Sequence, residues 1–295
     1  MRYSVGIDIG GTNVKFVLLK NLSILKKIKI STPKSKEKIV KAITGNVKDL
    51  TLGISRYKIS GIGIGIAGPL DLSRRIVLNS PRLKDLRKYP LADVLKKELK
   101  LKIVMDNDSN CFALAEAVLG AGKGYDLVLG VTLGSGIGGG IISKCKGKSK
   151  IFRGRSSAGE IGHMVINKEG SKCSCGNYGC FETEASEIFF KKRGLDSITE
   201  EKKAKAGNKR AKKLYLEFSK NLGIGLANLV NILDPDIIVI GGGFSKAGSL
   251  ILNPLKKEIK SRILSDQSKN VKIVLSKLGE FSGAIGAALL IKKYG

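Results

Sequence analysis

The chain has 295 residues, of which 42% are hydrophobic and 26% charged. This length suits about two domains, and the composition excludes disorder and a coiled coil. The formal net charge is +28, yet lysine supplies most of it, tryptophan is absent and aromatic residues reach only 5%. Because proteins that read or stack on bases favour arginine and aromatic side chains, we expect a lysine-rich solvated surface and no dedicated nucleic-acid binding.

The first half of the chain predicts an α/β domain. Short β-like runs at residues 3–9, 14–19 and 24–30 alternate with turns, which indicates an antiparallel meander. A lysine-rich helix is predicted at about residues 35–49, a strand at 59–67, a helix at about 91–99 and a strand at 103–105. An apolar stripe at helical spacing then follows Asn107, so Asp108 should lie where a strand gives way to a helix.

A second meander begins at Leu127 and repeats the first at an offset of 124 residues, since 130 − 6 = 124. The matched pieces are Gly-Ile-Asp-Ile-Gly at residues 6–10 and Gly-Val-Thr-Leu-Gly at residues 130–134. Two copies of one strand-turn-strand unit predict two related domains, which we place at residues 1–117 plus 282–295 and at residues 118–281.

The remaining elements follow from similar patterns. After an irregular cysteine-bearing segment, we expect a long helix at about residues 208–233, a buried strand at 237–240, a triple glycine and a helix-strand-helix ending. The longest uncharged stretch, residues 127–143, contains six glycines and is a poor membrane span. Asp8 lies where the apolar segment of a signal peptide would be, so we expect a cytoplasmic protein without membrane attachment.

Two glycine turns are candidate phosphate sites. Gly10-Gly11-Thr12 and Gly134-Ser135-Gly136 follow strands at corresponding places in the repeat, and glycines allow backbone N–H groups to point into one concavity. A single turn of this kind would be an ordinary hairpin, but Asp8 before the first turn and Lys15 after it favour a phosphate and magnesium site. The string from Gly134 fits a dinucleotide fingerprint, yet it opens a strand, so that interpretation fails.

The five cysteines are an odd number and suit a reducing compartment better than a disulfide framework. Three of them and the only histidine make a full tetrahedral set for zinc: His163, Cys173, Cys175 and Cys180. Glu160 and Glu182 flank these ligands and could bind hydroxyl groups once a metal orders the loop. Because the glycine turns are distant in the sequence, we expect them to be built separately from this loop. Cys111 is interpreted as a buried helix residue and Cys145 as a loop residue.

Five motifs together resemble the ROK family of sugar kinases and sugar-responsive repressors, and they occur in that family's order over nearly the whole chain. They are Asp8-Ile-Gly-Gly-Thr-Asn-Val-Lys15, Asn107-Asp108-Ser-Asn-Cys-Phe-Ala-Leu-Ala-Glu116, Thr132-Leu-Gly-Ser-Gly-Ile-Gly-Gly-Gly140, Ala158-Gly-Glu-Ile-Gly-His163 and Cys173-Ser-Cys-Gly-Asn-Tyr-Gly-Cys-Phe-Glu182.

This resemblance implies the α/β actin-like ATPase (ribonuclease H-like) fold, with two domains around a cleft that takes ATP, Mg²⁺ and a hexose. Asp108 matches the catalytic base. The positions that match sugar-binding residues are Asn79, Asn107, Asp108, Glu160, His163 and Glu182, and those that resemble phosphate, magnesium and nucleoside positions are Asp8, Gly10, Gly11, Thr12, Lys15, Thr132, Gly134, Gly136, Gly241, Gly242 and Gly243. The stretch after Asn79 departs from the family pattern, which leaves the identity of the sugar open.

The resemblance implies an ATP-dependent hexokinase that phosphorylates the 6-hydroxyl group of a hexose. We place glucose first, because residues 157–163 resemble the glucokinase branch, and an N-acetylhexosamine kinase second. Use of polyphosphate in place of ATP stays open, and a homo-oligomer, dimer or tetramer, is expected. A sugar-sensing repressor is the rival class, but its helix-turn-helix module would precede the first strand, which is predicted to begin at Tyr3.

Overall fold

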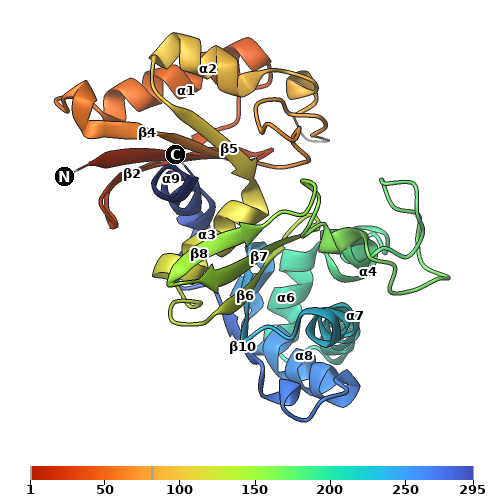
Figure 1. Cartoon of the computed structure of the whole chain (residues 1–295). Helices are drawn as coiled ribbons and strands as arrows, with labels where there is room; N and C mark the ends of the chain where they lie inside the picture. Colours follow the sequence, from red (N-terminus) through yellow and green to blue (C-terminus); the bar gives the residue numbers. More distant parts are fainter. Residues whose placement is uncertain (1, 81–82, 295) are drawn as a thin grey trace.

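The computed structural model describes residues 2–80 and 83–294, which form two five-stranded sheets (Figure 1). The first sheet has the order β3-β2-β1-β4-β5 and consists of β1 (Tyr3–Ile9), β2 (Asn13–Lys20), β3 (Ser23–Ser31), β4 (Ile59–Ile66) and β5 (Ile103–Asn107). The second has the order β10-β9-β6-β7-β8 and consists of β6 (Leu127–Leu133), β7 (Ile137–Cys145), β8 (Lys148–Phe152), β9 (Ile237–Gly241) and β10 (Lys272–Leu275).

The two sheets share one topology. In the first, β1 pairs antiparallel with β2 and parallel with β4, and in the second, β6 pairs antiparallel with β7 and parallel with β9. The strands β1 and β6 begin at Tyr3 and Leu127, which keeps the offset of 124 residues found in the sequence. The predicted internal repeat is therefore confirmed.

Helices and sheets alternate in layers (Figure 1). The helices α1 (Lys36–Leu50) and α2 (Leu91–Leu99) share a core with the outer face of the first sheet. Two helices, α3 (Asp108–Leu119) and α9 (Ser282–Tyr294), lie between the sheets and share a core with both. On the outer face of the second sheet, α7 (Lys209–Leu233) and α8 (Ser249–Arg262) complete the stack. Because successive side chains of a strand point to opposite faces, each sheet contributes side chains both to its outer core and to the core around α3 and α9.

Glycines at equivalent positions of the repeat admit the two central helices. A Cβ atom at Gly6 of β1 would lie 1.9 Å from the carbonyl oxygen of Ala284 in α9. At Gly130 of β6, a Cβ atom would lie 2.6 Å from the Cβ of Ala113 in α3. The helices also touch each other, since a Cβ atom at Gly286 would lie 1.7 Å from a backbone oxygen of α3. Backbone-to-backbone packing of this kind has no room for side chains.

Several elements were not predicted from the sequence. The cysteine-bearing segment is followed by three short helices, α4 (Phe181–Ala185), α5 (Glu187–Lys191) and α6 (Ser197–Lys205). The edge strand β8 follows β7 through a turn at Lys146 and Gly147, both of which have positive φ. Cys145 is consequently the exposed last residue of β7 and not a loop residue, whereas Cys111 lies buried in α3 as expected. Among the described residues, no helix has the length and apolar character needed to cross a membrane.

The glycine packing generates a stability prediction. Gly6→Ala should destabilise the protein by more than about 1–3 kcal/mol, the usual range for overpacking, because the new Cβ meets backbone atoms of α9 that cannot turn aside. Gly45→Ala in α1 is the matched control, since its Cβ meets nothing within 4 Å, and there alanine should stabilise by about 0.5–1 kcal/mol. Urea unfolding measures both, and equal effects of the two substitutions would contradict the packing argument.

Candidate active site

Asp108 is held at the junction of β5 and α3. The side chain of Asn107 caps the helix, because its Oδ1 accepts the N–H groups of Ser109 at 2.9 Å and Asn110 at 3.4 Å. Oδ1 of Asp108 accepts the same N–H group of Ser109 at 2.8 Å. The Ser109 hydroxyl lies 3.0 Å from that of Thr132 on β6, so a chain of polar contacts joins the candidate base to the second sheet.

Asp8 lies close to Asp108. Burial raises the pKa of Asp8 to about 7, and the charge of Asp108 adds to this rise, while Lys15 opposes it. The Lys15 Nζ on the paired strand β2 is 3.9 Å from Asp8 Oδ2. Gly283 in α9 leaves room for the carboxylate, since a Cβ atom there would come within 2.9 Å of it. Two carboxylates in one partly desolvated place, with one lysine beside them, form a setting that favours a bound cation.

The first glycine turn is a supported hairpin. The N–H group of Gly10 donates to the Asn13 carbonyl at 3.0 Å. Thr32, which directly follows β3, donates its hydroxyl to the Gly10 carbonyl at 2.7 Å and its N–H group to the Thr12 carbonyl at 2.9 Å. A cavity of about 250 Å³ opens beside this turn, and Gly11, Thr32 and Lys34 are among the residues that line it. The turn therefore has both a fixed shape and open space next to it.

The second glycine turn and the triple glycine are neighbours, because Thr132 of β6 pairs with Gly241 of β9. Cβ atoms at Gly134 or Gly243 would meet nothing within 4 Å. Gly242 has a φ of 88° and packs on the carbonyl of Leu133, which only glycine tolerates well. The structure thus brings these two predicted nucleotide-binding glycine segments together and leaves open space beside Gly134 and Gly243.

Two segments that carry residues predicted to bind sugar are linked to the region of Asp108 by contacts or by charge. Asn79 is exposed, and its backbone packs on Gly68, whose carbonyl accepts the Asn107 side-chain amide at 3.5 Å. In the second segment, partial desolvation raises the pKa of Glu160; the charge of His163 opposes this rise, and the charges of Asp108 and Glu182 add to it. Glu160 is thus electrostatically coupled to both carboxylates.

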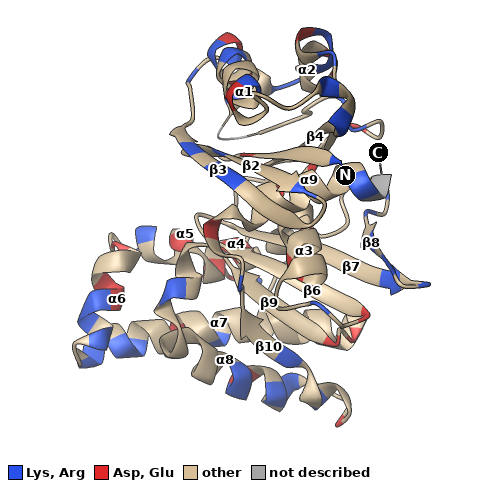
Figure 2. Ribbon diagram, turned by 90° about the vertical axis from the view of Figure 1, so that its left-hand side faces the viewer, with Lys and Arg blue, Asp and Glu red and all other residues tan. Residues whose placement is uncertain are grey.

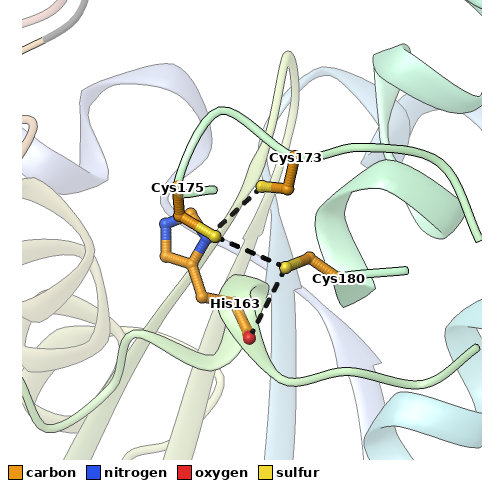
Figure 3. Close-up of side chains that lie close together, drawn as sticks. All are labelled: His163, Cys173, Cys175 and Cys180. Carbon is orange, nitrogen blue, oxygen red and sulfur yellow. Dashed lines mark hydrogen bonds between the residues drawn. The ribbon is translucent and has the colours of Figure 1, made fainter. Parts of the chain in front are cut away.

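The three cysteines and His163 converge as predicted (Figure 3). Their ligand atoms lie within 4.8 Å of one another. The Sγ atoms of Cys175 and Cys180 are 3.6 Å apart, and Cys173 Sγ is 3.7 Å from His163 Nδ1. A tetrahedral zinc ion with Zn–S of about 2.3 Å and Zn–N of about 2.0 Å requires ligand separations of about 3.5–3.8 Å. The cluster therefore has the donor types that a zinc ion needs, and these two pairs of ligand atoms already have the spacing that it requires.

The expectation that this loop is built separately from the glycine turns is wrong for the second turn, at residues 134–136. Glu182 Oε1 is 3.2 Å from Cys173 Sγ, and a Cβ atom at Gly136 would lie 2.6 Å from Glu182 Oε2. The N–H group of Glu187 also donates to the Gly134 carbonyl at 3.0 Å. Residues that are distant in the sequence meet here because the loop and α4 fold back over the start of β7.

Sequence reasoning missed a buried ion pair next to the candidate base. Asp106, with a side chain 3% exposed, accepts Nε and Nη2 of Arg153 at 2.8 and 2.7 Å, and Arg74 Nε lies 3.7 Å away. Asp106 also accepts the Asn107 N–H group and the Asn110 side-chain amide, both at 2.9 Å. Its position one residue before Asn107 was the only available signal.

The two sheets repeat one topology, and each contains a glycine turn between its first two strands. The central helix α3 carries Asp108, and α9 contacts Asp8. This arrangement is that of an α/β protein of the actin-like ATPase fold. Residues 4–294 match the model of the ROK family, and the chain belongs to this family.

Individual relatives include enzymes and regulators. The chain is 34% identical to a glucokinase of Halalkalibacterium halodurans over 99% of this chain and 96% of that protein. It is 30% identical to a xylose repressor of Bacillus subtilis over 98% of this chain and 77% of that protein. The crystal structure of a ROK family glucokinase from Streptomyces griseus, in complex with glucose and AMPPNP, is similar with a TM-score of 0.83 at 32% identity and covers 98% of both chains.

The raised pKa of Asp8 predicts a pH effect on stability. The native state keeps this proton from the ordinary pKa of 3.8 up to about 7, so the free energy of unfolding falls as the pH rises through that window. Asp8→Asn cannot ionise and should gain stability relative to the unmodified protein across the same window. Urea unfolding at several pH values measures this.

Asp266→Asn is the control, and its effect on stability should have the opposite sign, because a hydrogen bond with Lys269 lowers the pKa of Asp266. A pH-independent difference for Asp8→Asn would contradict the prediction.

Proposed function

We propose that this protein transfers the γ-phosphoryl group of ATP to the 6-hydroxyl group of a hexose, with glucose as the first substrate. The observation that carries the proposal is the position of Asp108 at the start of a helix, where it is electrostatically coupled to both Asp8 and Glu160. The glucokinase relatives support the activity and the choice of glucose.

Phosphoryl transfer needs positioning and charge stabilisation more than covalent help from the protein. The backbone N–H groups of the turns at Gly10 and Gly134 would bind phosphate oxygens, and the hexose would lie between Asn79 and the segment that carries Glu160 and Glu182. Asp108 accepts the proton of the 6-hydroxyl group as its oxygen attacks phosphorus, and the bond from phosphorus to the leaving oxygen of ADP breaks. Contact between Ser109 and Thr132 keeps Asp108 in register with the second turn.

Asp8 fits a position that would hold Mg²⁺. Its pKa is raised by burial and by Asp108, so a cation there would stabilise the ionised form. The bound metal would neutralise negative charge on the phosphates. Lys15, whose Nζ lies near Asp8, adds a second positive charge on the same side.

A zinc ion fits the cluster of His163, Cys173, Cys175 and Cys180, and we include it in the proposal. Burial raises the pKa of the Cys173 and Cys180 thiols, whereas a hydrogen bond from the backbone of Asn177 lowers that of Cys175. A divalent cation would stabilise thiolates that burial otherwise disfavours. The role of the metal is then structural, because it orders the loop that positions Glu160 and Glu182.

A sugar-sensing regulator remains the alternative class, since xylose repressors are among the relatives. The retained Asp108 and Asp8 favour catalysis, because binding a sugar alone requires neither a base nor a cation site. A coupled assay that measures phosphoryl transfer with a panel of sugars and phosphoryl donors tests the glucose assignment against an N-acetylhexosamine substrate and a polyphosphate donor. A cytoplasmic location, a dimer or tetramer, and the domain limits given above stay predictions.

Asp108→Asn keeps the shape of the side chain and removes the base. Turnover of glucose should fall by about 10²–10⁴-fold, while calorimetry should still detect glucose binding. Asn107 still caps α3 in this variant, so a loss of fold is not expected. Near-normal turnover would overturn the assignment of Asp108 as the base.

Cys175→Ser should weaken metal binding by more than about 100-fold, the upper range for loss of an outer partner. Because Glu182 touches both the cysteine cluster and the turn at Gly136, affinity for glucose and for an ATP analogue should both fall. Cys145→Ser, an exposed cysteine outside the cluster, is the control and should change neither. Unchanged affinities in metal-free Cys175→Ser protein would show that the cluster does not organise the site.

A further inference from the structure

A second, larger cavity lies along the edge of the first sheet. It has a volume of about 960 Å³, and the edge strand β5 supplies part of its wall. Seven of its fourteen lining residues are Lys or Arg and one is Asp, whereas 53 of the 295 residues of the chain are basic. The basic residues are Arg74, Arg75, Lys96, Lys97, Lys100, Lys102 and Arg153. This enrichment exceeds what the general charge of the protein explains.

Most of this charge is not neutralised by the protein. Asp93 forms an ion pair with Arg75. Within residues 2–80 and 83–294, the lysines at positions 96, 97, 100 and 102 form no ion pair with a carboxylate. Figure 2 shows that basic residues are spread over both halves of the molecule, α2 included, but here several of them face one shared space. Like charges around one cavity attract a multivalent anion.

The chemistry of the lining favours phosphate groups over bases. Lysine acts as a point charge that suits phosphate oxygens from several directions. None of the fourteen lining residues is aromatic, so the cavity offers no aromatic ring for a base to stack on. The volume falls in the range of small-molecule sites.

Two residues of the cavity wall are linked to the candidate base through Asp106 and Asn107. Arg153 and Arg74 both line the cavity and both approach the buried carboxylate of Asp106. Asp106 in turn accepts the Asn107 N–H group, and Asn107 caps the helix that begins with Asp108. An anion in the cavity would compete with Asp106 for the two arginines.

We propose that this cavity is a binding site for a small polyanion of the phosphate-ester or oligophosphate class, and that its occupant acts on Asp108 through the contacts of Arg153 and Arg74 with Asp106. The binding site stands on its own, whereas the effect on turnover rests on the function proposed above. The site is separate from the glycine turns, because no residue of either turn lines this cavity.

Binding is tested by calorimetric titration of inorganic tripolyphosphate into protein whose nucleotide and sugar sites are filled with an ATP analogue and glucose. The variant with Lys96→Gln, Lys97→Gln and Lys102→Gln should bind tripolyphosphate at least tenfold more weakly. The control carries Lys212→Gln, Lys213→Gln and Lys256→Gln, which remove the same charge from exposed positions on α7 and α8. An equal loss in both variants, or no stoichiometric binding to the unmodified protein, would overturn the site.

The source of the anion is distinguished by parallel titrations with glucose 6-phosphate and with a short single-stranded oligonucleotide. Tighter binding of glucose 6-phosphate than of tripolyphosphate would identify a phosphate ester, and the reverse an oligophosphate. An oligonucleotide that binds more tightly than either, and loses affinity in the cavity variant, would overturn the small-anion assignment.

The effect on catalysis is measured as turnover at saturating ATP and glucose, with and without tripolyphosphate. Turnover should fall several-fold in the unmodified protein and in the control variant, and stay unchanged in the cavity variant. If tripolyphosphate only raises the KM for ATP, equally in all three proteins, it acts at the nucleotide site and the coupling is wrong. Protein without any kinase activity would contradict the proposed function, while the titration would still decide the binding site.

Discussion

The close packing of α3 and α9 between two related sheets is the constraint on which the rest of the structure depends. Gly6 admits α9 to the first sheet, and Gly130, at the equivalent position of the repeat, admits α3 to the second. Because these contacts involve backbone atoms, the helices cannot move far without breaking them. The start of α3 thereby carries Asp108 to the place where Asp8 lies against α9.

The candidate site is rich in acidic side chains, whereas the chain as a whole has a large positive charge. A protein with a net charge of +28 places Asp8, Asp108, Glu160 and Glu182 in one region, where burial and mutual repulsion raise the pKa of Asp8 and Glu160. Such a cluster is unfavourable unless a cation or a hydroxyl-rich ligand compensates it. The basic cavity beside β5 is the complementary case, in which seven basic residues outnumber the carboxylates of Asp93 and Asp106 that pair with three of them.

The cysteine loop contacts the second glycine turn, so the cysteine cluster and that turn are not structurally independent. Glu182 lies against the cysteine cluster with one carboxylate oxygen and faces Gly136 with the other. A metal that orders this loop would therefore affect both the proposed sugar site and the proposed nucleotide site. Asp106 makes a comparable connection, because its ion pair with Arg153 joins the end of β5 to the residue that follows β8.

Local patterns in the sequence were sufficient to predict most strands and helices, the internal repeat and the convergence of the three cysteines with His163. Alternation, helical spacing and glycine turns act over a few residues, and the ligands lie within one loop. The pairing of Asp106 with Arg153 joins residues 47 apart, and no local pattern signals it. The contact of Glu182 with Gly136 likewise depends on how the loop folds back over β7. These contacts arise from the packing of distant segments, so only the tertiary structure could reveal them.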